Sequence, residues 1–88
     1  MLNKGQKVID TFKGEIDTFG GEILENEFYG KEAIIIGQDC DNDYYAFYPN
    51  CELGWQPTDE EYEIIKSLGI NESGTISYIF EDYYEVVE

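Results

Sequence analysis

Carboxylates are the most numerous groups in this chain that could do chemistry. The 88 residues include 20 aspartates and glutamates, five lysines, and neither histidine nor arginine, which gives a formal net charge of −15. Without histidine, the commonest general base of enzymes is missing. Two carboxylates can hydrolyse a glycoside, but no spacing singles out one pair among the acids. The sequence therefore predicts a protein that is not an enzyme.

The two cysteines, Cys40 and Cys51, lack neighbours that would stabilise a thiolate. Two cysteines without histidine do not make a zinc site. Residues 39–43, DCDND, are similar to the start of an EF-hand calcium loop, but Tyr44 stands where that loop needs glycine and Asn50 where it needs an acid. We therefore expect a turn at 39–43, no metal and no cofactor. We expect two reduced thiols, with a disulfide around this loop as the alternative.

The net charge limits the class of partner. Solubility of a small domain needs a charge of only roughly 2 to 8, and self-repulsion at −15 destabilises the compact state. Direct binding to nucleic acid or to an anionic membrane needs lysine and arginine on the phosphates. Duplex DNA as long as a domain of this size, about 30 Å, carries roughly 18 charges. We therefore expect a basic nucleic-acid-binding protein as the partner, and neither nucleic acid nor membrane.

The acids are concentrated in the second part of the chain. Residues 1–38 hold seven acids and four lysines, whereas residues 39–88 hold thirteen acids and one lysine. Acids one helical turn apart, or alternate along a strand, are about 6 to 7 Å apart, like phosphates along a backbone. Tyrosines between them are typical of interface hot spots. The predicted partner-binding residues are Asp39, Asp41, Asp43, Tyr45, Glu52, Asp59, Glu60, Glu63, Glu81, Asp82, Tyr83 and Glu85.

A small folded domain must position these side chains. The length predicts one domain, residues 1–88, whose acidic half is residues 39–88. A content of 42% hydrophobic and 16% aromatic residues is typical of a globular domain and not of a disordered acidic tail. We predict an α+β fold with an antiparallel sheet of about four strands, one helix in the C-terminal half and a possible helix at the N-terminus.

Four segments have strand patterns. Residues 22–28, 32–38 and 44–48 are predicted to form an antiparallel meander, with the β-branched run at 32–38 as its central strand. Residues 75–88 alternate with period two and predict one long final strand. The residues predicted to share one face of that strand are Ile76, Tyr78, Phe80, Tyr84 and Val86. Asp82 interrupts this face, so we expect its outer half not to be fully buried.

The segment YYAFY, residues 44–48, can bury either of its two faces. One choice places Tyr45 and Phe47 in the core, and the other places Tyr44, Ala46 and Tyr48 there. Because so small a domain cannot bury all eight tyrosines, we expect this strand to bury one face and to present the other to the partner.

Residues 58–68 carry the clearest helix signals. Thr58 and Glu61 form a capping-box pattern, and acids in the first turn favour the helix dipole. Gly69 ends the helix, and its apolar face is Ile64, Ile65 and Leu68.

Two other segments are ambiguous. Residues 3–14 are compatible with a helix or a strand, and we favour the helix. Trp55, in the loop between Pro49 and Pro57, either plugs the core or projects as an anchor, and we favour the core.

In size, charge, aromatic content and lack of histidine and arginine, the chain resembles small acidic inhibitors carried by phages and mobile elements: anti-CRISPR proteins, anti-restriction proteins and uracil-DNA glycosylase inhibitors. The resemblance covers no aligned segment and implies no residue roles. It implies an inhibitor that mimics nucleic acid and blocks the DNA- or RNA-binding cleft of a target enzyme. The alternative is an acidic adaptor or immunity-type protein that binds a basic partner outside any nucleic-acid site.

The start of the chain, MLNKGQKVID, has no apolar run of the kind found in signal peptides. We therefore expect a protein of the cytoplasm of a bacterial host cell. Because an interface between copies must avoid the acids, we expect a monomer, or a homodimer formed through the less charged half.

Overall fold

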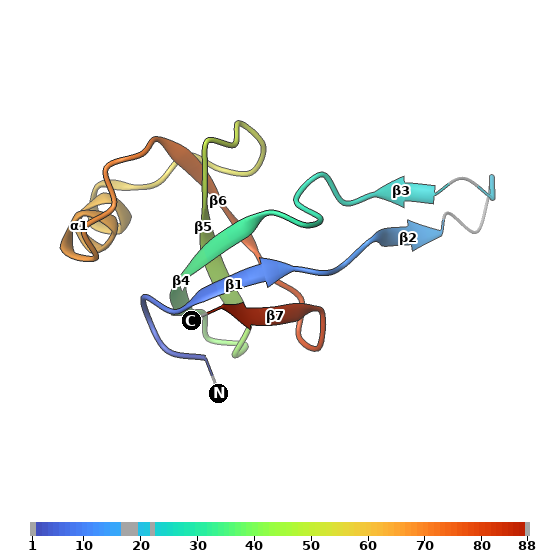
Figure 1. Ribbon diagram of the computed structural model, residues 1–88, viewed down its shortest axis with the longest axis horizontal. Coiled ribbons are helices and arrows are strands. Elements are labelled where there is room, and N and C mark those ends of the chain that lie inside the picture. Colours follow the sequence, from blue (N-terminus) through green and yellow to red (C-terminus); the bar gives the residue numbers. More distant parts are fainter. Residues whose placement is uncertain (1, 17–19, 22, 88) are drawn as a thin grey trace.

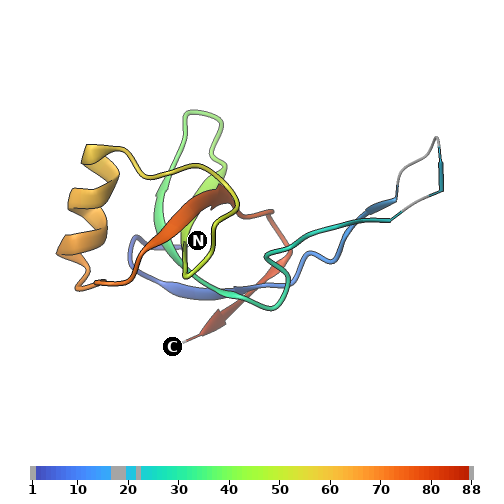
Figure 2. The ribbon, with the colours of Figure 1, turned by 90° about the horizontal axis from the view of Figure 1, so that it is seen from above.

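The computed structural model describes residues 2–16, 20–21 and 23–87. A sheet and one helix form the body, and a two-stranded arm projects from it (Figure 1). The longest dimension is 43 Å and the other two are 26 and 25 Å. The helix and the arm lie at opposite ends of the long axis (Figure 2).

Five strands form the main sheet, and all neighbouring strands are antiparallel. Their spatial order is β6 (Gly74–Tyr78), β5 (Tyr44–Pro49), β4 (Glu32–Gln38), β1 (Lys7–Asp10) and β7 (Tyr84–Val87). The α+β class is confirmed, and β4 is the central strand, as its β-branched run predicts. The sheet has five strands, one more than the number expected.

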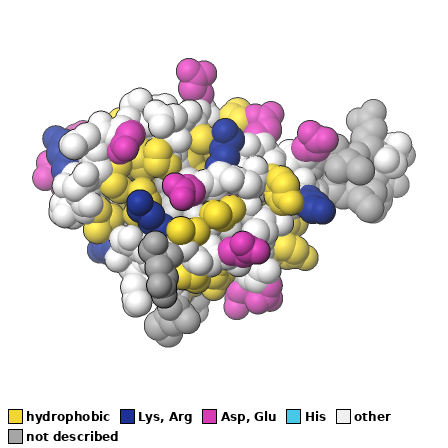
Figure 3. Space-filling model, viewed as in Figure 1, with side chains coloured by type: hydrophobic (Ala, Val, Ile, Leu, Met, Phe, Trp, Pro, Cys, Tyr) yellow, Lys and Arg dark blue, Asp and Glu magenta, His cyan; other side chains and the backbone are white. Residues whose placement is uncertain are grey.

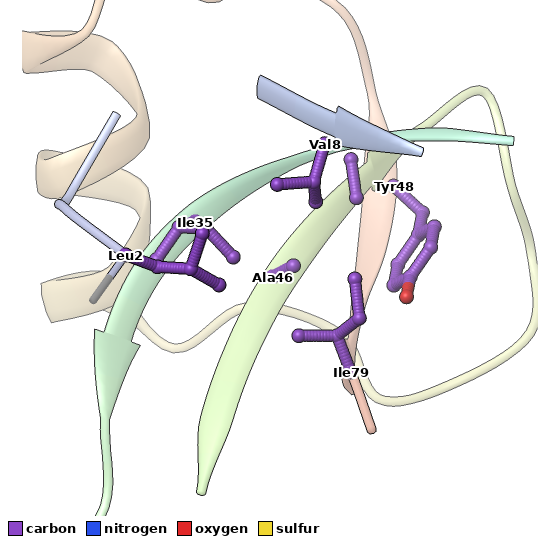
Figure 4. Close-up of a cluster of buried hydrophobic side chains, with 7 residues drawn as sticks. Leu2, Val8, Ile35, Ala46, Tyr48 and Ile79 are labelled. Atoms are coloured by element: carbon purple, nitrogen blue, oxygen red, sulfur yellow. The ribbon is translucent and has the colours of Figure 1, made fainter. Parts of the chain in front are cut away.

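Successive residues of a strand point to opposite sides of the sheet, and a cluster of buried side chains packs on each side. One face packs a cluster that includes Ile35 of β4 and Tyr48 of β5 (Figure 4). The other face packs a cluster that includes Ile36 of β4, Phe47 of β5 and Ile65 of the helix.

The prediction that residues 44–48 bury one face and expose the other is wrong. Ala46, Phe47 and Tyr48 are each 0% exposed, so β5 is covered on both faces. Tyr45, predicted to contact a partner, is half-buried, and its ring lies over Gly37, where a Cβ atom would come within 2.7 Å of the Tyr45 hydroxyl. β5 has no free face because Ala46 and Tyr48 belong to the cluster on one side of the sheet and Phe47 belongs to the cluster on the other.

The helix α1 (Asp59–Ser67) agrees with the prediction. Thr58 is the N-cap, and its hydroxyl accepts a hydrogen bond from the Glu61 amide at 3.2 Å while the Glu61 carboxylate accepts one from the Thr58 amide at 2.8 Å. Ile65 is buried, and Ile64 and Leu68 pack against the cluster on the helix side of the sheet.

The arm consists of β2 (Gly14–Ile16) and β3 (Ile23–Glu25), which pair only with each other. The predicted strand at 22–28 is therefore shorter and does not join the meander. Residues 26–30 turn instead, with the Tyr29 amide bonded to the Asn26 carbonyl at 3.0 Å and Gly30 at a φ of 78°. Residue 22 lies outside the described residues.

A buried carboxylate ties the arm to the body. Asp10 is 1% exposed, and its Oδ1 accepts hydrogen bonds from the Phe12 amide at 2.9 Å and the Asn26 side-chain amide at 3.1 Å. Its Oδ2 accepts a hydrogen bond from the Tyr48 hydroxyl at 2.9 Å. Burial and the Asp10 charge raise the pKa of Tyr48, so this hydroxyl stays a donor.

The N-terminal segment is a strand, so the preference for a helix at 3–14 is wrong. β1 lies between β4 and β7, and Val8 is opposite Ala33 on one side and Val86 on the other. Pairing along both edges satisfies the backbone of this segment and buries Val8 completely. These contacts come from distant parts of the chain, so local sequence could not reveal them.

The predicted long strand over residues 75–88 is also wrong, because it is two strands separated by a turn. β6 ends at Tyr78 and β7 begins at Tyr84 on the opposite edge of the sheet. Asp82 has a φ of 68°, a left-handed conformation that Asp tolerates better than most residues. Ile76, inside β6, is buried, whereas Tyr78 at the end of β6 and Phe80 before the turn are 45% and 47% exposed.

Within the described residues, no helix is both long enough and apolar enough to cross a membrane.

Candidate protein-interaction surface

Two segments that are distant in sequence meet at one edge of the body. One is the loop between β4 and β5, and the other follows β6, where the Ile79 amide donates a hydrogen bond to the Tyr44 carbonyl at 3.0 Å. Between them lies an open hollow of about 450 Å³, which we call the aromatic–acidic hollow. It is lined by Asp39, Asp41, Asp43, Tyr78, Ile79, Phe80 and Glu81.

The loop of residues 39–43 is shaped by its first carboxylate. The Asp39 Oδ1 atom accepts hydrogen bonds from the amides of Asp41 at 2.9 Å and Asp43 at 3.0 Å. Asn42 has a φ of 66°, and the Asp39 amide bonds to the Asp43 carbonyl at 3.0 Å. The expected turn at DCDND is thus present, and it is built by a local side-chain bond of the kind that Asp favours.

The Asp39 carboxylate also interacts with the ring hydroxyl of Tyr78. The hydrogen bonds from the backbone, the one from Asp43 first, hold the pKa of Asp39 below its ordinary value. The neighbouring Asp39 carboxylate raises the pKa of Tyr78. At neutral pH the pair is therefore an ionised carboxylate and a neutral phenol.

Exposed aromatic rings extend from both ends of the hollow. Trp55 lies 5.4 Å from Tyr78, measured between ring centroids, and Phe12 lies 4.4 Å from Phe80 and 5.0 Å from Tyr83. Trp55, Tyr78, Phe80 and Tyr83 are between 37% and 49% exposed. Phe12 is half-buried between two of these rings. We call Phe12, Trp55, Tyr78, Phe80 and Tyr83 the aromatic strip. The preference for Trp55 as a core residue is therefore wrong.

The loop before α1 holds Trp55 at the edge of the sheet. Its amide donates a hydrogen bond to the Ile76 carbonyl, and its carbonyl accepts one from the Ile76 amide, both at 2.9 Å. These bonds add a bridge to the free edge of β6. The backbone of Trp55 is thus fixed while its indole remains on the surface.

The turn at 80–83 places acids beside the strip. The Tyr83 amide bonds to the Phe80 carbonyl at 3.2 Å, and the Thr11 amide bonds to the Tyr83 carbonyl at 2.9 Å. Glu81, Asp82 and Tyr83 are all exposed in this turn. A second hollow, of about 250 Å³, lies next to the first and shares Asp43, Ile79 and Glu81 with it.

The other predicted partner-binding residues lie elsewhere. Asp59, Glu60 and Glu63 are exposed on α1, which covers the other face of the sheet. Glu52 lines a separate hollow, of about 500 Å³. Glu85 is exposed on β7, opposite Ile9 of β1. The predicted set is therefore divided among several surfaces.

The face of the molecule in Figure 3 has no continuous acidic patch. Its acidic side chains are separated from one another, and lysines lie among them. With the acids of α1, the Glu52 hollow and β7, acids are present on more than one surface of the body, and the aromatic–acidic hollow is the place where acids lie beside exposed rings.

Sequence reasoning found only part of the aromatic surface. Tyr83 was among the predicted contacts and is exposed here. Trp55 was expected in the core, and Phe12 was not singled out. Tyr78 and Phe80 were assigned to one face of a single long strand, although Asp82 already indicated that part of this face is not fully buried.

Cysteine and metal chemistry do not account for this surface. Cys40 and Cys51 are free thiols, and the Cys51 thiol donates to the Pro49 carbonyl with an S–O distance of 3.6 Å. Among the residues with described positions, no three carboxylates or thiols are arranged to hold a metal ion.

No protein-family model matches the chain, no curated protein matches its sequence, and no solved structure matches its fold. Fold and surface together define a small α+β domain with an exposed surface of acids and aromatic rings. Its function is therefore argued from that surface.

Proposed function

We propose that this protein is an inhibitor that mimics nucleic acid and blocks the DNA- or RNA-binding cleft of a basic target enzyme. In type it is an anti-defence protein of a phage or mobile element, acting like an anti-CRISPR, anti-restriction or DNA-glycosylase-inhibitor protein. The contact surface is the aromatic–acidic hollow with the adjoining strip. One observation carries this proposal: four carboxylates from two distant segments surround exposed aromatic rings.

The chemistry of this surface suits a nucleic-acid-binding cleft. Such clefts present lysine and arginine to the phosphates, and aromatic side chains on which bases stack. Carboxylates at Asp41, Asp43 and Glu81 supply negative charge in place of phosphates, and the rings of Tyr78 and Phe80 supply flat apolar faces in place of bases. A net charge of −15 adds attraction over a longer range, so association is fast and weakens with salt.

A competition experiment tests the proposal. The partner is captured from a lysate of the natural host at low salt, purified, and loaded with a fluorescent DNA or RNA ligand. Adding the unlabelled protein should release the ligand and lower its fluorescence polarisation. A stable ternary complex, with the ligand still bound, would exclude mimicry.

A ternary complex would favour the second candidate, an adaptor or immunity-type protein that binds outside the nucleic-acid site. The observation in its favour is the separate set of acids on α1, at Asp59, Glu60 and Glu63, away from the exposed strip.

A further inference from the structure

We propose that the aromatic–acidic hollow binds arginine side chains of a protein partner in preference to lysine. The inference rests on the proposed basic partner and specifies which of its side chains this surface recognises. It follows from the faces of the rings, the carboxylates that are free to pair, and the charge of the hollow.

The Tyr78 and Phe80 rings at the hollow are partly exposed. Tyr78 and Phe80 are two residues apart and 45% and 47% exposed, whereas Ile79 between them is 3% exposed and packs into the core. The Ile79 side chain thus anchors the segment, and the two rings remain on the outside. The planar guanidinium of arginine stacks on such faces and loses less hydration than an ammonium group does.

Of the four carboxylates around the rings, one accepts hydrogen bonds from the protein and three accept none from the described residues. Asp39 accepts two backbone hydrogen bonds. The side chains of Asp41, Asp43 and Glu81 accept none from any other residue that the structure describes. Carboxylates in this state can pair with the fork of N–H donors on a guanidinium, which forms two parallel hydrogen bonds.

The charge of the hollow selects a cationic occupant. Four of its seven lining residues are acids, and none of the described lining residues is a lysine. A volume of about 450 Å³ exceeds the needs of one side chain. Trp55 contacts Tyr78, and Phe12 contacts Phe80, so further rings adjoin the two that line the hollow.

The chain carries its own reporter for this binding. Trp55 is the only tryptophan, and its ring lies 5.4 Å from that of Tyr78. The experiment titrates the full-length protein at low salt with two blocked heptapeptides, GRGRGRG and GKGKGKG, which differ only in the cation. Tryptophan fluorescence gives the affinity, and backbone NMR shifts of residues 39–43 and 78–81 give the location.

We expect the arginine peptide to bind about two- to fivefold more tightly than the lysine peptide, as a stacked guanidinium at an exposed site predicts. In the double variant Tyr78→Leu/Phe80→Leu the preference should disappear, because leucine keeps apolar area but has no ring face. The charge-matched variants Asp41→Asn/Glu81→Gln and Asp59→Asn/Glu63→Gln test the location. The first should weaken both peptides, and the second should weaken neither by more than the small loss in net charge explains.

Equal affinity for the two peptides, or shifts located on α1, would overturn the inference. In either case the proposed inhibitor function stands if the captured partner still releases its nucleic acid. Conversely, an arginine preference at the hollow together with a stable ternary complex would support the inference and exclude nucleic-acid mimicry.

Discussion

The acids of α1 and the acids of the aromatic–acidic hollow are both exposed, but they differ in what they do for the fold. Asp59, Glu60 and Glu61 lie in the first turn of α1, where negative charge stabilises the helix dipole, and Glu61 completes the capping box. Asp41 and Glu81 make no comparable side-chain bond with the described residues. They lie beside exposed aromatic rings. Apolar area left in water contributes nothing to the stability of the fold.

This difference gives a criterion for a binding surface in an acidic protein. A carboxylate that stabilises its own helix has a local explanation, so its presence says little about partners. A carboxylate without a partner in the fold, next to exposed aromatic rings, has no such explanation. Density of charge along the sequence does not separate these two groups, whereas their hydrogen bonds do.

The largest effect should come from reversing charge on each surface in turn. Asp41→Lys/Glu81→Lys should weaken binding to the captured partner by about 100-fold or more, since each reversal replaces attraction by repulsion. Asp59→Lys/Glu63→Lys carries the same change in net charge and should cost less than about tenfold, because salt screens charges beyond about 10 Å. Surface plasmon resonance measures both affinities.

Equal losses in these two variants would show that only total charge matters and would remove the distinction between the surfaces. Asp82 is left unchanged in this test although it was among the predicted contacts. Its φ of 68° disfavours lysine, so a reversal there would mix strain with charge.

A buried carboxylate extends the comparison to acids that hold the fold together. Replacing Asp10 by alanine removes the acceptor for Tyr48, Asn26 and the Phe12 amide. We expect the free energy of unfolding to fall by about 2 to 4 kcal/mol. The control, Asp41→Ala, should change it by less than about 0.5 kcal/mol.

Urea denaturation followed by circular dichroism measures the stability of both variants. A loss in Asp41→Ala as large as that in Asp10→Ala would mean that the hollow acids also hold the fold. Their exposure would then have a structural explanation, and the comparison between the two groups would fail.

Local signals account for what could be predicted from the sequence. The capping box and the β-branched run of β4 lie within single elements, so α1 and the central strand were correctly predicted. The strand β1 and the arm depend on pairing with distant segments and on the buried side chain of Asp10, which no local pattern reveals. Asp82 interrupts the apolar alternation in the sequence, but that signal alone did not reveal the left-handed turn that divides the segment into two strands.

The acids of the candidate surface could be predicted from the sequence, whereas the rings beside them in the hollow could not. Asp39, Asp41, Asp43 and Glu81 were chosen by charge, and the fold brings these four together. Tyr78 and Phe80 were not among the predicted contacts, because period-two alternation assigned them to one face of a single long strand. Neither is covered by α1, which is only nine residues long and packs over the middle of the sheet.

A smaller effect should separate helix stability from partner binding. Thr58→Ala removes the N-cap oxygen that accepts a hydrogen bond from the Glu61 amide, and should lower the free energy of unfolding by about 1 kcal/mol. Binding of the partner or of the arginine peptide should not change, since α1 is not part of the hollow. Thermal unfolding and the peptide titration measure the two quantities. A loss of peptide affinity in this variant would place α1 in the binding surface.

The smallest effect concerns the pair of Asp39 and Tyr78. Because the ionised carboxylate raises the pKa of Tyr78, Asp39→Asn should lower that pKa toward its ordinary value of 10.0. The pKa is raised in the folded state, so this contribution to stability is complete below pH 10 and is lost as pH rises through the folded-state pKa.

Asparagine keeps an acceptor for the loop amides, so the loop itself should persist. NMR shifts of the Tyr78 ring across the alkaline range, assigned with Tyr78→Phe, measure the change, and Asp59→Asn is the control. An unchanged Tyr78 pKa in Asp39→Asn would mean that the Asp39 carboxylate is not the group that raises it.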